Sequence, residues 1–163
     1  NLYGIYLGRK MDKIDKEILK IIQINASMPL SELSKRVGIS STPCWNRIKK
    51  MEEEKVILSR VTIIDNKKIN LPNIAFLYVQ APSHSDEWVK KFNLKINEYE
   101  QIVESYRISG SHDYLLKVLF TSSIEDYDIF QQKFIRETGC NNMQTSFVQK
   151  ELKNKKSMPF DFI

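Results

Sequence analysis

The sequence predicts an α+β protein with two domains, an N-terminal, winged-helix-like helix-turn-helix domain and a C-terminal ferredoxin-like βαββαβ domain. Apolar residues follow helical spacing in the first third of the chain, whereas strand-like and helical stretches alternate after residue 73. Residues 1–60 carry 12 Lys/Arg against 7 Asp/Glu, and residues 61–163 carry 13 of each. This asymmetry is expected when only one of two domains meets a polyanion.

The first predicted helix begins after Asp12 and carries Ile14, Ile18 and Ile21 on one apolar stripe. Asp12 and Asp15 both lie in its first turn, where carboxylates interact favourably with the positive end of the helix dipole. The stripe stops near residues 25–27, so the helix is expected to end there.

Two further helices are expected before residue 56. The second follows Pro29 and ends at Gly38, since glycine accepts the left-handed backbone of a helix C-terminus. The third starts at Ser40 or Ser41, either of which can cap it, and runs to about Lys55. Three helices with a glycine-containing turn before the last one are typical of a helix-turn-helix.

The predicted domain boundaries follow composition. Residues 1–10 precede the first methionine and are interpreted as an extension or tag-like segment, and the helix-turn-helix domain takes residues 11–60. Polar residues make 61–72 the hinge or linker, and residues 73–163 form the second domain. The β-branched stretch 56–64 is expected to form a short wing or hinge strand.

The second domain is predicted to contain four strands and two helices. The strands are expected over residues 74–81, 102–109, 114–120 and 143–152. One helix follows the turn at 82–85, and Ser122 or Ser123 caps the other, which Gly139 ends. The strands are apolar on both faces, so sheet-to-sheet dimerisation is expected. The residues behind that expectation are Phe76, Tyr78, Tyr106, Leu116, Phe120 and Phe147.

Several classes of protein find no support in the residues. Cys44 and Cys140 lie far apart with no metal-type spacing, and the chain has only two histidines, so no metal site, cofactor or disulfide framework is expected. No apolar run approaches the ~20 residues of a membrane span, and the expected setting is reducing and cytoplasmic. No nucleophile–base pair, phosphate loop or carboxylate pair indicates an enzyme.

Four motifs in order resemble those of the Lrp/AsnC (leucine-responsive/asparagine) transcription regulators. The resemblance spans nearly all of residues 12–160. Its motifs are residues 14–19 (IDKEIL), 33–38 (LSKRVG), 40–44 (SSTPC) continued by 47–52 (RIKKME), and 110–118 (GSHDYLLKV). It implies dimers that often assemble further, commonly to octamers, and small effectors, usually amino acids, bound between C-terminal domains.

The third helix is the candidate for the major groove of double-stranded DNA. Ser41, Thr42, Trp45 and Asn46 lie near its start, where base edges are read, and asparagine can pair bidentately with adenine. The basic residues are expected to contact phosphates, which position a protein without reading sequence. They are Arg47, Lys49, Lys50, Lys35 and Arg36. Packing of Trp45 against the first helix is the alternative, and Cys44 is expected to be a small buried hydrophobe.

The turn at 110–114 is the candidate effector site. Gly110 permits a tight turn that exposes N–H groups, and Asp113 is suited to accept hydrogen bonds from a ligand ammonium. Ser111, His112 and Tyr114 complete the candidate set, with His112 in a position to tune ligand choice. The alternative is a plain hairpin in which Asp113 bonds its own turn.

The predicted function is a sequence-specific DNA-binding transcription regulator whose oligomeric state or DNA binding responds to a small effector. An effector sensor without DNA binding is one alternative, although the charge surplus of residues 1–60 disfavours it. A sirohaem-decarboxylase-like enzyme is the other. It would need basic and histidine residues around a macrocycle cleft, whereas residues 40–44 and 113–118 resemble the regulators.

Overall fold

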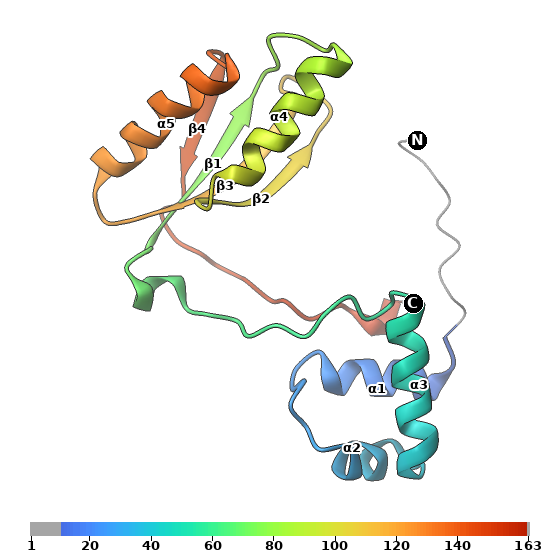
Figure 1. Cartoon of the computed structure of the whole chain (residues 1–163). Helices are drawn as coiled ribbons and strands as arrows, with labels where there is room; N and C mark the ends of the chain where they lie inside the picture. Colours follow the sequence, from blue (N-terminus) through green and yellow to red (C-terminus); the bar gives the residue numbers. More distant parts are fainter. Residues whose placement is uncertain (1–10, 163) are drawn as a thin grey trace. The chain divides into compact units, whose positions relative to one another are not determined.

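The computed structural model describes residues 11–162, which form two compact units (Figure 1). The helical unit comprises residues 11–62 with 153–162, and the sheet unit comprises residues 63–152. The prediction had placed residues 153–163 in the second domain; of these, residues 153–162 join the first, because Phe160 packs against the helical core. The segment 1–10, predicted to be an extension, lies outside the described residues.

Three helices make up most of the helical unit: α1 (Lys13–Ile22), α2 (Leu30–Val37) and α3 (Ser41–Glu53). The Asp12 carboxylate caps α1 by accepting the Asp15 backbone N–H at 2.8 Å, and Gly38 ends α2 with a φ of +73°. Ser34 is buried and its hydroxyl lies 3.2 Å from that of Ser41, so α2 and α3 approach closely. The core side chains are Ile18, Leu19, Leu33, Cys44, Ile48 and Met51.

Two details of the first domain differ from expectation. Helix α3 ends at Glu53, because Lys55 adopts a left-handed backbone with a φ of 59°. The predicted strand at 56–64 is not formed: within residues 11–162 no strand lies beside this segment, and a single strand cannot satisfy its own backbone groups.

The sheet unit has the predicted βαββαβ order. Its four strands form one antiparallel sheet in the order β2-β3-β1-β4, with β1 pairing both β3 and β4. Ser85 and Ser123 cap the two helices through their hydroxyls. The elements are β1 (Asn73–Val79), α4 (Asp86–Glu98), β2 (Ile102–Arg107), β3 (Tyr114–Phe120), α5 (Ile124–Thr138) and β4 (Met143–Phe147).

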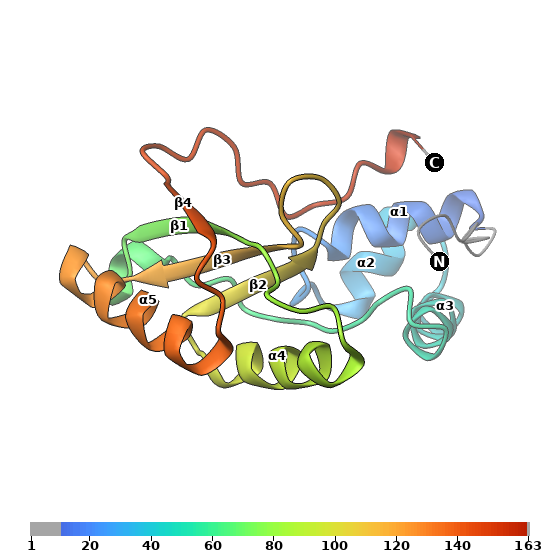
Figure 2. The ribbon, with the colours of Figure 1, turned by 90° about the horizontal axis from the view of Figure 1, so that it is seen from above.

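Figure 2 shows α4 and α5 covering one face of this sheet. Of the six residues predicted to make the strands apolar on both faces, Phe76, Tyr78 and Tyr106 lie on the other, open face, opposite the buried residues of each strand. Leu116, Phe120 and Phe147 instead belong to the helix-covered face, because they pair with or pack against buried residues there. Within the described residues, no helix has the length and apolar character needed to cross a membrane.

Candidate nucleic-acid interface and effector site

Helix α3 presents two chemically different faces. Cys44, Ile48 and Met51 are buried in the helical core, and burial raises the pKa of the Cys44 thiol. Cys44 is therefore the buried hydrophobe that the sequence predicted. The four residues predicted to read bases are all exposed, although the Ser41 hydroxyl also lies 3.2 Å from that of the buried Ser34. They are Ser41, Thr42, Trp45 and Asn46.

Trp45 stands outside the helical core with 49% of its surface exposed. The Lys49 ammonium lies 5.0 Å from the centroid of its ring, a cation–π contact one helical turn away. The indole and the ammonium thus form one continuous surface, apolar at one end and cationic at the other.

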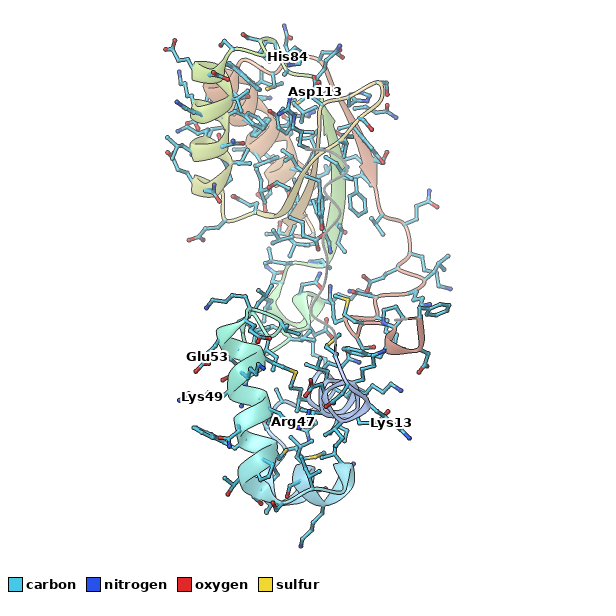
Figure 3. All side chains as sticks on the ribbon, turned by 90° about the vertical axis from the view of Figure 1, so that its right-hand side faces the viewer. Lys13, Arg47, Lys49, Glu53, His84 and Asp113 are labelled. Carbon is cyan, nitrogen blue, oxygen red and sulfur yellow. The ribbon has the colours of Figure 1, made fainter. Side chains whose placement is uncertain are left out.

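Arg47 points to the other side of its helix, toward α1 (Figure 3). Its guanidinium donates to the carboxylate of Asp12 at 2.6 Å and to that of the buried Asp15 at 2.8 Å. These two hydrogen bonds raise the pKa of Arg47, and the pKa of Asp12 is lowered, first by the Asp15 backbone N–H and then by Arg47. Arg47 therefore ties α3 to α1, a role that the sequence analysis did not assign to it.

Surface ion pairs surround the exposed face of α3. Lys49 and Lys50 lie 4.0 and 3.9 Å from Glu53 and Glu54, one turn further along the helix. Arg36 pairs with Glu32 in α2 at 2.6 Å, and Lys35 is exposed beside it. Exposed pairs of this kind contribute about 0–1 kcal/mol, so a phosphate group can replace the carboxylate at little cost.

Asp113 holds the β2–β3 hairpin to the end of β1. Its carboxylate accepts the Ala81 N–H at 2.8 Å, and its backbone N–H donates to the Val79 carbonyl at 2.9 Å. Its own carbonyl accepts the Ile108 N–H at 2.8 Å, which closes the hairpin. Asp113 thus bonds both its own hairpin and a neighbouring segment, and the sequence analysis did not foresee the second of these roles.

The other residues of this turn divide between solvent and core. Gly110 has a φ of +125°, which favours glycine, and no atom lies near the position of a Cβ. The Ser111 hydroxyl lies 3.0 Å from His112 Nδ1, and the His112 ring is 5.7 Å from that of Tyr78 on the open face. Tyr114 packs 4.6 Å from Phe92 in the core, so its ring does not line a ligand site at the turn.

His84 is a neighbour of this turn that the sequence analysis left unused. Its Nε2 lies 3.9 Å from the second carboxylate oxygen of Asp113, and the two side chains lie close together in Figure 3. The two residues are 29 positions apart, so no local spacing signals the contact. The turn therefore presents an imidazole, a carboxylate oxygen and a hydroxyl at one end of the sheet.

Comparison with known proteins assigns both units. Residues 11–57 match the model of a winged helix-turn-helix DNA-binding domain, and residues 74–158 match that of the Lrp/AsnC ligand-binding domain. The glutamate uptake regulatory protein of Zymomonas mobilis is 36% identical, with 93% of this chain and 92% of that protein aligned. The DNA-binding transcriptional activator DecR of Escherichia coli is 29% identical over 93% of this chain and 99% of its own.

Solved structures agree with these sequence matches. An AsnC family transcriptional regulator from Agrobacterium tumefaciens has a TM-score of 0.88 and 38% identity, covering 94% of this chain and 99% of its own. A transcriptional regulator of Neisseria meningitidis, solved as its complex with L-Met, has a TM-score of 0.87 and 27% identity over 93% and 98% of the two chains. The chain therefore belongs to the Lrp/AsnC family of DNA-binding transcription regulators.

Proposed function

We propose that α3 enters the major groove and that Ser41, Thr42, Trp45 and Asn46 contact base edges. The observation that carries the proposal is the exposure of all four side chains near the start of α3. The side chains that contact phosphates are Lys35, Arg36, Lys49 and Lys50. Arg47 is assigned a positioning role instead, because two carboxylates hold its guanidinium.

Titration against two labelled DNA fragments tests this assignment. One fragment carries the DNA upstream of the protein's own gene, the other the same bases scrambled, and both are measured at two salt concentrations. Asn46→Ala removes the preference for the upstream fragment, a loss of about 1–3 kcal/mol of discrimination. Lys50→Ala weakens binding to both fragments and reduces the slope of log affinity against log salt concentration by about 1. Equal losses in the two variants contradict the division between readout and positioning.

The open face of the sheet supports a homodimer. Phe76, Tyr78 and Tyr106 give it an apolar surface around the ion pair between Lys117 and Glu104, whose side chains are 2.8 Å apart. Pairing with the same face of a second copy covers this surface, and each contact between the two copies then occurs twice, related by the two-fold axis. Further assembly, to the octamer that the family resemblance implies, then brings the 110–113 turns of different dimers together.

An amino acid is the effector class that we assign to this turn. The Neisseria relative was solved with L-Met, and the turn offers Asp113 and backbone N–H groups to a ligand that carries both an ammonium and a carboxylate. A ligand held between copies shifts the population of oligomers, which changes the spacing of the helix-turn-helices on DNA in the cytoplasm.

Calorimetry with each of the twenty amino acids, combined with sedimentation, tests the effector and the oligomer together. The expected result is binding by one or a few amino acids, with a change in oligomeric state, and loss of both in Ser111→Trp, which blocks the exposed turn without removing the structural bonds of Asp113. Phe76→Glu yields monomers. Absence of any amino-acid binding by the wild-type protein, together with intact DNA binding, refutes the effector class alone.

The family assignment also bears on catalysis. We infer that the protein regulates without catalysing a reaction, since no catalytic chemistry stands out in its residues. Incubation with sirohaem followed by absorption spectroscopy distinguishes a regulator from a sirohaem-decarboxylase-like enzyme. A Soret band in the protein fraction indicates macrocycle binding and overturns the inference.

A further inference from the structure

The end of the chain returns to the first domain. Residues 153–162 leave the sheet unit after β4 and end in a short turn, Phe160–Phe162, that lies beside α1 (Figure 1). The helical and sheet units are therefore joined by two stretches of chain, one before β1 and one after β4. Nothing in the periodicity of the sequence required this return.

The contacts that hold the return involve backbone, charge and apolar surface. The Gln23 side-chain amide donates to the Met158 carbonyl at 3.3 Å, and its oxygen accepts the Met158 N–H at 2.7 Å. One side chain thereby satisfies both backbone groups of a residue 135 positions away. Lys20, in the last turn of α1, lies 3.0 Å from the Asp161 carboxylate, which raises the pKa of the lysine.

Two phenylalanines near the end of the chain differ in their surroundings. Phe160 is partly buried and packs against the helical core together with Val56 and Ile57. Phe162 is 86% exposed and borders a cavity of about 600 Å³ that lies between the tail, α1 and residues 56–60. Phe160 thus belongs to the fold of the helical unit, and Phe162 serves as a matched control of the same residue type.

We propose that residues 153–162 complete the helical unit by packing on α1 and residues 56–60, and that they couple this unit to the sheet unit. We call this segment the latch. The helical unit has few buried side chains, so packing of Phe160 adds to its buried apolar area. Gln23 in turn supplies a hydrogen-bond partner to the backbone of Met158. The second connection between the helical and sheet units also excludes relative orientations of the two units that a single flexible linker would allow. For the proposed DNA-binding function, on which this last step rests, it favours simultaneous binding of two half-sites by a dimer.

Hydrogen–deuterium exchange of the full-length protein tests the latch without DNA. Phe160→Ala and Gln23→Ala are expected to speed exchange of the α1 amides, the former by about tenfold, with α4 and α5 unchanged as internal controls. Phe162→Ala leaves α1 exchange at the wild-type rate. Unchanged α1 exchange in both Phe160→Ala and Gln23→Ala overturns the latch, and so does an equal effect of Phe162→Ala.

DNA titration of the same variants tests the coupling. Phe160→Ala is expected to weaken binding to the upstream fragment and to leave the affinity for the scrambled fragment unchanged, because only specific binding needs two units at a fixed spacing. Faster α1 exchange with an unchanged preference for the upstream fragment overturns the coupling. If the wild-type protein shows no preference for the upstream fragment, the proposed base contacts of α3 are refuted instead. The hydrogen–deuterium exchange experiment then still tests whether residues 153–162 stabilise α1.

Discussion

The two units of this chain are stabilised by different means. Among the described residues, the core of the sheet unit buries fourteen apolar side chains, seven of them aromatic, whereas the core of the helical unit buries six, none of them aromatic. The helical unit adds the Arg47 ion pairs between α3 and α1 and the contacts of residues 153–162. The smaller core of the helical unit thus leaves a larger share of its stability to polar and long-range contacts.

The largest effect is expected from a cavity in the aromatic core. Phe134 is fully buried and its ring lies 5.7–6.1 Å from those of Tyr99, Phe130 and Phe92. Phe134→Ala should destabilise the sheet unit by about 3–5 kcal/mol, measured by urea denaturation followed by circular dichroism. Phe147→Ala, at a half-exposed ring, is the control, and an equal loss of stability there contradicts the comparison of cores.

The second effect concerns the ion pairs of the helical unit. Arg47→Ala leaves the buried Asp15 carboxylate without one of its partners and should lower the free energy of unfolding of this unit by about 1–2 kcal/mol, less than for a fully buried pair because water reaches Arg47. Arg36→Ala, which removes an exposed pair, should cost less than about 0.5 kcal/mol. If Arg47→Ala retains full stability and loses only affinity for DNA, then Arg47 is a phosphate contact as the sequence suggested.

A smaller effect distinguishes the exposed face of α3 from its buried face. Trp45→Ala should change stability by less than about 0.5 kcal/mol, because the indole lies outside the core. Its affinity for DNA should fall, since the ring and the Lys49 ammonium form one surface. A large loss of stability in thermal denaturation shows that Trp45 packs as part of the fold.

The smallest effect is a dependence on pH. The pKa of Asp12 is lower in the folded protein than in the unfolded chain, so its charge stabilises the fold at pH above the unfolded pKa and this contribution is lost as pH falls through the folded pKa. Asp12→Asn keeps an oxygen that caps α1 and removes the charge. The variant should therefore lose less stability than the wild type between about pH 5 and about pH 3. Identical acid profiles contradict a contribution of the Asp12–Arg47 pair.

The sequence predicted most of the elements because their signals are local. The stripe of α1, the glycines that end α2 and α5, and the serine that caps α5 each depend on residues within one or two turns. The expected strand at 56–64 was wrong for the converse reason: β-branched residues favour extended backbone, but a strand also needs a neighbour. Element type is therefore easier to predict than pairing.

Individual roles of charged residues were harder to predict. Arg47 lies on the same helix as Lys49 and Lys50, and helical spacing alone does not show that Asp12 and Asp15 lie across from it. Asp113 lies in a turn of the predicted shape, yet its partner Ala81 belongs to another connection. In each case a carboxylate joins two segments of the fold that lie far apart in the sequence.

The sequence by itself determined the two-domain order, the helix-turn-helix, the βαββαβ topology and the polar character of the outer face of α3, because these follow from local periodicity, capping and composition. Only the tertiary structure decided which charges face each other, which aromatic rings lie beneath the helices and where residues 153–162 pack. The physical reason is that such contacts join residues 32 to 135 positions apart. Their energy depends on distances that no local pattern encodes.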